Sequence, residues 1–407
     1  MKKRNILFFA LVLVPALFLM AEPVYSPTWG FRLDLPEGYE LIGGDKKNTF
    51  SFSSSFGTTL DIVVNTGKAS AVSITEDIEK KLSNKGKIQA FTYNNREAVV
   101  MELRFIQGGI TITGWALCME LETQAASSSK GGPNVKAHLT ALAYGPEKAD
   151  LQYLHLSVLD SIEGSELDHR LPGAITEFLH PRGKWITVKL ANSSETPHFR
   201  DNDAEAAQSV VDREFNVMKF YLNSPLWQEA WKRFYRAIFK DSFDRLQNAA
   251  FLMERSWNNS VLGPSGEDAK PEDEDRLGKR SAEANTIAAK ALEWVQGFEY
   301  ERDLMGSDFV NLVTSAQEGR GDCDSRALLW AIILSQANIP SGIMVSREYS
   351  HAMGLADLEG EGAHFPMKDR AGKDIRWLVA ETTSKVSLGL IGETVSEVSN
   401  WLGITFE

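Results

Sequence analysis

The sequence predicts an α+β protein in which a mostly antiparallel sheet precedes a unit of helices and short strands. Two observations support this prediction. Before about residue 165, several short runs alternate apolar with polar residues and end at Gly- or Pro-containing turns, as strands do. After about residue 205, apolar residues recur at helical spacing before strand-like runs return. With 407 residues, 43% of them hydrophobic and 24% charged, the chain is long enough for more than one core.

The first residues have the pattern of an export signal. Residues 2–4 are basic, residues 6–20 are mainly apolar, and the small residue Ala21 follows. The apolar run is short for a bilayer span, which favours a cleaved signal peptide at residues 1–21 over an uncleaved membrane anchor. We therefore expect a periplasmic or secreted protein without an integral membrane span after signal removal, because no later segment is long enough to cross a bilayer.

Residues 22–165 predict an antiparallel α+β domain. A strand and turn are expected at residues 29–39, and residues 74–82 have helical spacing. The Ser-, Gly- and Ala-rich residues 123–135 predict a long hairpin loop. The remaining strand-like runs are residues 58–65, 88–92, 97–105, 110–121, 137–144 and 150–156, the last continuing into residues 157–162.

Residues 166–204 are expected to connect this domain to a second one at residues 205–407. A helix and a strand are expected within residues 171–190 of the connection. In the second domain, aromatic residues at helical spacing over 227–239 form a stripe. Such a stripe could bind a ligand, but core packing is the preferred interpretation.

Further helices are expected at residues 241–257 and 282–296. Between them, residues 263–280 are dense in Gly, Pro, Asp and Glu, which predicts an acidic solvated loop. An inert insertion is preferred there over a flap near a functional site.

The charge and cysteine content narrow the classes of function. A net charge of −12 argues against nucleic acid or anionic lipid as the main partner. The two cysteines, Cys118 and Cys323, are far apart in the sequence and make no disulfide framework. We interpret Cys118 as a packed residue and Cys323 as a free nucleophile.

Cys323 lies in the sequence Gly-Asp-Cys-Asp-Ser-Arg, immediately before an apolar run. This pattern predicts a cysteine in the first turn of a buried helix, where the helix dipole stabilises a thiolate. Asp322 and Asp324 are candidate caps, and their charges oppose thiolate formation. We expect both side chains to bind backbone amides and face away from the sulfur, which would leave the thiol with a depressed pKa.

His351 and Glu381 complete a candidate Cys-His-carboxylate triad. His351 is expected to begin a strand and Glu381 to end one. In this arrangement His351 takes the thiol proton and Glu381 orients the ring. Each residue alone also has a structural interpretation: packing for the cysteine, a satisfied strand position for the histidine and a turn cap for the glutamate. Gln317, six residues before Cys323, is a weak candidate oxyanion donor, and His364 is expected on a loop.

These residues resemble the transglutaminase-like superfamily, and the motifs Gly-Asp-Cys-Asp, His-Ala-x-Gly and Glu-Thr-Thr are similar to those of its bacterial and archaeal branch. The resemblance implies a papain-like α+β domain with Cys323 as nucleophile, His351 as base and Glu381 as orienter. Met353 departs from the family pattern, in which an aromatic residue is usual. The start of residues 22–165, Gly-Phe-x-Leu-x-Leu-Pro-Glu-Gly, resembles PsbP-like domains, which carry no catalytic residues.

The sequence therefore favours a thiol-dependent enzyme that transfers an acyl group from an amide, with peptide or isopeptide hydrolysis preferred over cross-linking. Its partner would be a protein or peptide substrate, with no cofactor and no metal, since no metal-ligand spacing is present. The alternative is a non-catalytic binding or assembly module of the cell envelope. The sequence does not indicate the oligomeric state.

Overall fold

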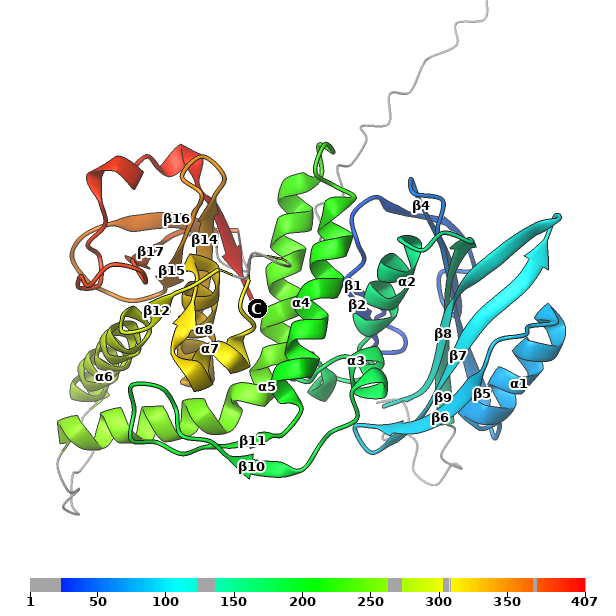
Figure 1. Ribbon diagram of the computed structural model, residues 1–407, viewed down its shortest axis with the longest axis horizontal. Helices are drawn as coiled ribbons and strands as arrows, with labels where there is room; N and C mark the ends of the chain where they lie inside the picture. The colour runs from blue at the N-terminus through cyan, green and yellow to red at the C-terminus, as the bar shows by residue number, and fades with distance from the viewer. Residues whose placement is uncertain are drawn as a thin grey trace, which may run out of the picture.

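The computed structural model describes residues 23–122, 136–262, 273–302, 307, 309–368 and 372–406, without the side chains of 259–262 and 273–280. The protein is α+β, as predicted, with two antiparallel sheets separated by the long helices α4 (Asp203–Lys219) and α5 (Trp227–Leu262) (Figure 1). The predicted signal peptide and the 123–135 loop lie outside the described residues. Where independently folding domains begin and end stays a prediction.

The first sheet contains seven strands in the order β3-β4-β5-β9-β8-β7-β6, all antiparallel. The strands are β3 (Tyr39–Gly43), β4 (Thr49–Ser54), β5 (Thr59–Gly67), β6 (Ile88–Tyr93), β7 (Arg96–Gln107), β8 (Ile110–Leu121) and β9 (Lys136–Pro146). Alternate residues of β5, such as Leu60 and Ile62, are fully buried. Helix α1 (Ala71–Leu82) covers the opposite face and begins at Ser70, whose side chain accepts a hydrogen bond from the Ser73 amide.

The run expected as a strand at residues 150–156 is instead the helix α2 (Leu151–Asp160). Leu151, Leu154 and Val158 are buried at helical spacing. Moreover, β9 already pairs with β5 on one side and β8 on the other, so it has no free edge for a following strand. The chain therefore turns back and lays α2 on the face of the sheet opposite α1 (Figure 1).

The connection holds the expected helix and strand as α3 (Ala174–Leu179) and β10 (Trp185–Thr187), and β10 pairs with β11 (His198–Arg200). Three short elements complete this half of the molecule. They are the paired strands β1 (Val24–Tyr25) and β2 (Arg32–Leu33), and the 3-10 helix η2 (Leu167–Arg170).

The two helices expected at residues 227–239 and 241–257 are one continuous helix, α5. Its aromatic stripe is core, as preferred: Phe234, Tyr235 and Ile238 are all buried. The expected acidic loop is shorter than predicted, because α6 (Asp273–Gln296) already begins inside it and the rest of the loop lies outside the described residues. Acidic residues near a helix N-terminus interact favourably with the helix dipole, which explains why this charged stretch is helical.

The second sheet has five antiparallel strands in the order β16-β17-β15-β14-β18. They are β14 (Ser341–Ser346), β15 (His351–Ala356), β16 (His364–Lys368), β17 (Asp374–Ala380) and β18 (Leu402–Thr405). His364 thus begins a strand and does not lie on a loop, because the segment before it returns to pair with β17. Helix α8 (Cys323–Gln336) packs on β14 and β15 and is buried from Ala327 to Leu334, as its all-apolar sequence predicts.

Buried ion pairs join the two halves of the molecule through α5. Arg233 donates to Glu214 of α4 at 2.7 Å and to Ser157 of α2 at 2.7 Å, while Arg236 forms a bidentate pair with Asp34. Helix α5 therefore lies between the two sheets and holds the two halves of the molecule together. Across the described ranges, no helix combines the length and apolar character that a bilayer crossing requires.

Candidate functional site

The candidate site begins at the N-terminus of α8. Asp322 is the helix N-cap: its Oδ1 accepts hydrogen bonds from the Ser325 amide at 2.8 Å and the Ser325 hydroxyl at 2.6 Å. The short parallel pair β12 (Glu299–Tyr300) and β13 (Arg320–Gly321) fixes the backbone that leads into this cap. Cys323 is consequently held in the first turn of a rigid helix, with only 3% of its surface exposed.

His351 and Glu381 are brought together by adjacent antiparallel strands. His351 begins β15, Glu381 follows β17, and Nε2 of the ring lies 2.8 Å from Oε2 of the carboxylate. The other oxygen, Oε1, accepts hydrogen bonds from the Thr383 amide at 2.8 Å and its hydroxyl at 2.6 Å. From α6, the Gln296 side chain donates to the carbonyls of Glu381 and Val386 and so fixes the turn after β17.

The Cys323 thiol lies against the beginning of β15. The backbone N–H of Ala352, the residue after His351, donates to the sulfur. The structure thus brings the three predicted triad residues into one small region, from α8, β15 and the end of β17. Cys118, by contrast, is a buried free cysteine within the seven-stranded sheet, next to Thr140.

The expected depressed pKa of Cys323 is wrong for the resting structure. Burial, followed by the charges of Asp324 and Asp322, raises the pKa of Cys323 to about 12, against the lowering influence of the Ala352 amide and Arg302. Asp322 caps the helix as predicted, but a cap within the first turn remains close enough to act on the sulfur electrostatically. A thiolate therefore needs a further source of stabilisation.

Asp324 is half-buried and lies close to Tyr235 of α5. Its side chain is hydrogen-bonded to Tyr235 of the aromatic stripe. Burial first, and then the charge of Asp322, raises the pKa of Asp324 well above its usual range. The contact with Tyr235 was not predictable from the sequence, because an aromatic residue in a buried stripe is indistinguishable from simple core packing.

An aromatic side chain packs on the histidine. The Trp401 ring packs edge-on against His351, with centroids 6.1 Å apart, and contacts Tyr349 at 5.5 Å. Its indole N–H donates to the Val395 carbonyl at 2.9 Å, which fixes the ring orientation. Trp401 lies 50 residues from His351 in the sequence, and only the pairing of β18 with β14 places it here.

Close to the cysteine, Tyr300 is half exposed and accepts a hydrogen bond from Arg302 at 3.2 Å. Arg302 also lines a cavity of about 300 Å³ together with Val310 and Arg320. The Ser325 hydroxyl of the α8 first turn also lies 2.9 Å from the carbonyl oxygen of Val310, so this cavity borders the candidate site.

Gln317 lies half-buried on α7 (Leu312–Glu318), and its proposed oxyanion role stays a prediction. Over the described parts of the chain, no three His, Cys, Asp or Glu side chains are grouped so that they could hold a metal ion.

The histidine–glutamate pair defines which ring nitrogen can act as a base. Burial raises the pKa of Glu381, but the hydrogen bond and charge of His351 and the hydrogen bonds from Thr383 outweigh it and lower the pKa below the usual value. The ionised carboxylate only accepts hydrogen bonds, so Nε2 of His351 carries the proton. Nδ1 of the neutral ring then keeps a lone pair that can accept a proton.

Comparison with known proteins identifies no family. No family model and no curated protein match this chain. Among solved structures, it is similar to LpqN, involved in cell envelope biogenesis of Mycobacterium tuberculosis, with 12% identity over 31% of this chain and 78% of that chain and a TM-score of 0.23. It is also similar to the cyanobacterial PsbP of Synechocystis, with 11% identity over 37% and 95% and a TM-score of 0.27.

A third similar structure, from Bacteroides thetaiotaomicron, has 13% identity over 56% of this chain and 79% of that chain, with a TM-score of 0.25. A PsbP is therefore among the structures similar to this chain, as the N-terminal sequence suggested. Likeness at this level identifies neither a family nor an activity. The resemblance of the C-terminal part to transglutaminase-like proteins stays a prediction based on its motifs.

Proposed function

We propose that the protein is an exported thiol-dependent acyl-transfer enzyme that acts on an amide bond of a protein or peptide. Cys323 is the nucleophile, His351 the general base and Glu381 the orienting carboxylate. The observation that carries the proposal is the 2.8 Å contact between His351 and Glu381, next to the Ala352 amide that binds the Cys323 thiol. Peptide or isopeptide hydrolysis is the preferred reaction, and amine transfer is the related one.

The chemistry follows from the protonation state of the ring. Nδ1 of His351 first takes the Cys323 proton, and Glu381 stabilises the imidazolium. The sulfur of this ion pair then attacks the amide carbonyl carbon. When the C–N bond breaks, the proton passes to the leaving amine and a thioester remains. Water, deprotonated by the same nitrogen, then attacks the thioester, releasing a carboxylic acid and restoring the thiol.

The raised thiol pKa defines what His351 must supply. A lone thiolate at this buried position is disfavoured by both neighbouring aspartates, so the reactive species is a Cys323–imidazolium ion pair. Burial strengthens the attraction within such a pair, because the effective dielectric constant is low. The helix dipole of α8 acts in the same direction.

A non-catalytic envelope-binding module is the rival proposal, and a specific observation favours it. Cys323 is 3% exposed and its pKa is raised, which are properties of a packed structural cysteine. Under this second proposal, the contact between His351 and Glu381 only stabilises the ends of the neighbouring strands β15 and β17. The two proposals differ in the reactivity of the thiol.

Alkylation of Cys323 by iodoacetamide, followed by intact-mass spectrometry, tests the choice. All proteins carry Cys118→Ser, so that only one thiol remains; this position is buried in the other sheet, and burial raises the pKa of its thiol to about 11. The enzyme proposal expects labelling at pH 7 that is at least about tenfold faster than for the same protein with His351→Ala.

The matched control is Glu348→Gln, an exposed position three residues before His351. It should label at the rate of the parent. Equal, slow labelling of the parent and the His351→Ala protein would reject the enzyme and leave the binding module.

A further inference from the structure

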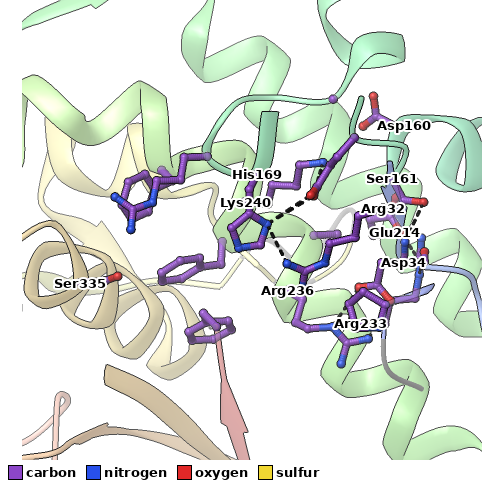
Figure 2. Close-up of a pocket in the computed structure, with 18 of the residues that line it drawn as sticks. Arg32, Asp34, Asp160, Ser161, His169, Glu214, Arg233, Arg236, Lys240 and Ser335 are labelled. Carbon is purple, nitrogen blue, oxygen red and sulfur yellow. Dashed lines mark hydrogen bonds and ion pairs between the residues drawn. The ribbon is translucent and has the colours of Figure 1, made fainter. Parts of the chain in front are cut away.

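A pocket with an excess of positive charge lies between the two halves of the molecule, away from Cys323. Its volume is about 320 Å³, within the range of small-ligand sites. One wall is the face of α5 that carries Arg233, Arg236 and Lys240 at helical spacing (Figure 2). Arg32 of β2 and His169 of η2 face this wall from the N-terminal half.

Cationic side chains outnumber carboxylates in the lining by two. The cations are Arg32, Arg170, Arg213, Arg233, Arg236 and Lys240, and the carboxylates are Asp34, Asp160, Glu163 and Glu214. Each carboxylate is engaged in an ion pair: Asp34 with Arg236, Asp160 with Arg213, Glu163 with Lys240, and Glu214 with Arg213 and Arg233. The excess positive charge of the pocket lining therefore belongs to the two arginines that have no carboxylate partner among these residues.

These two arginines are Arg32 and Arg170. Arg32 contacts Nδ1 of His169 at 3.4 Å, and the guanidinium of the exposed Arg170 lies 5.1 Å from the centre of the Phe243 ring. Within the described part of the chain, neither is paired with a carboxylate. Each contact leaves further N–H donors of the guanidinium unused, since the group has five.

The positive balance persists at neutral pH. Burial raises the pKa of Glu163, but Lys240 and His169 outweigh it and lower that pKa to about 2. Burial likewise opposes ionisation of Asp160 and Glu214, and their arginine partners still lower both pKa values. These carboxylates consequently stay ionised and do not add to the surplus by taking up protons.

Part of the pocket lining is apolar. Phe239 of α5 stacks on Phe406, with centroids 4.2 Å apart and planes inclined by 9°. Both line the pocket together with Phe243, Ala237 and Ile339. Arg170 borders these rings, because its guanidinium lies over Phe243. A ligand that fills the volume would therefore place its charged group beside the arginines and its apolar group against the phenylalanine rings.

We propose that this pocket binds a small oxyanion, a phosphate or a carboxylate, that carries a short apolar or aromatic group. Guanidinium groups bind both oxyanions through paired, charge-assisted hydrogen bonds, and partial burial strengthens such bonds. The surplus is local, because the chain as a whole carries a net charge of −12. The site does not depend on the chemistry proposed for Cys323.

The experiment is calorimetric titration of the full chain with phenyl phosphate, with benzoate and with uncharged benzyl alcohol. At least one of the two anions should bind with a Kd below about 1 mM, and benzyl alcohol should bind at least tenfold more weakly. Binding of phenyl phosphate alone would assign the site to phosphate esters, and binding of benzoate alone would assign it to carboxylates.

Two substitutions locate the site. Arg170→Gln and Arg32→Gln should each weaken binding of the better anion about tenfold, the loss expected for a hydrogen bond to a charged group. Arg104→Gln removes the same charge from an exposed position of β7 that does not line the pocket, and it should change nothing. Since Arg170 is exposed, its substitution decides the matter even if the Arg32 variant fails to fold.

Two results would overturn the proposal. One is that neither phenyl phosphate nor benzoate produces a heat of binding at concentrations up to about 10 mM. The other is equal affinity of the parent, Arg170→Gln and Arg104→Gln proteins.

Discussion

Replacing Glu381 by glutamine should disable His351 without removing any atom from the packing. The two carboxylate oxygens accept hydrogen bonds on opposite sides, Oε2 from His351 and Oε1 from the amide and hydroxyl of Thr383. Glutamine has only one acceptor oxygen. The NH₂ group of the glutamine faces either the His351 ring or the Thr383 amide. In each orientation it places an N–H donor against the donor that the carboxylate oxygen accepted from.

The cost depends on which side is lost. If the NH₂ group faces the ring, Nε2 must become an acceptor and the proton moves to Nδ1, which removes the proposed base. General-base catalysis would then fall by roughly 10²–10⁴-fold. If the oxygen faces the ring instead, the imidazolium loses a charged partner worth about 1.5–3 kcal/mol, which corresponds to roughly ten- to a hundredfold in rate.

The assay is the rate of Cys323 alkylation at pH 7 in a protein that carries Cys118→Ser, compared with Glu348→Gln as the matched control. We expect at least tenfold slower labelling for Glu381→Gln. The difference should shrink at high pH, where hydroxide deprotonates the thiol without His351. Labelling of Glu381→Gln at the control rate at pH 7 would refute the argument that Glu381 orients the base.

Glu381→Gln should also change how the free energy of unfolding depends on pH. Because the pKa of Glu381 is lowered in the folded state, its contribution is present above the ordinary value of 4.5 and is lost as the pH falls through the folded-state value. Urea unfolding should therefore show a gap between parent and Glu381→Gln at pH 7 that narrows at acidic pH. A gap independent of pH would mean that the charge is not involved.

Three further predictions concern the surrounding structure. Because the pKa of Asp324 is raised in the folded state, folding stability falls as the pH rises from 3.8, the ordinary pKa of an aspartate, through the folded-state pKa. Asp324→Asn should remove that part of the decline in urea unfolding. It should also speed alkylation of Cys323 at pH 8–9. Arg233→Met should destabilise the protein by about 3–5 kcal/mol in urea unfolding, because it breaks the buried pair with Glu214. Trp401→Ala should cost about 3–5 kcal/mol and slow Cys323 labelling, since it removes the ring packed on His351; unchanged melting and labelling would contradict this.

Local patterns were sufficient for much of the fold. Alternation predicted five of the seven strands of the first sheet but not β3 and β4, and the apolar run after Cys323 predicted a buried helix. The pattern failed at α2 (Leu151–Asp160), where apolar positions suit both a strand and a helix over a short window. Only the pairing of β9 on both edges decides between them, and this is a non-local property of the sheet.

The candidate site was predictable to a different degree. The meeting of His351 with Glu381 follows from the placement of each residue at a strand end, which the sequence indicated. The raised pKa of Cys323 did not follow, because it depends first on how deeply the thiol is buried and then on the charges of Asp324 and Asp322, whose side-chain positions are set by the tertiary packing of α8. Orientation of a side chain relative to a distant helix is not encoded in any local spacing.

Helix α5 connects the two proposed sites, because one of its faces lies beside Cys323 and the opposite face lines the basic pocket. One face places Tyr235 against Asp324 in the core beside Cys323, and the other presents Arg236 and Lys240 to the basic pocket. An anion in the pocket would interact with the charged face, and a change in the position of α5 would also move Tyr235. Coupling between the sites would require α5 to have two arrangements that both ligands distinguish. The buried pair between Arg233 and Glu214 opposes such movement, so the structure favours two sites that act independently.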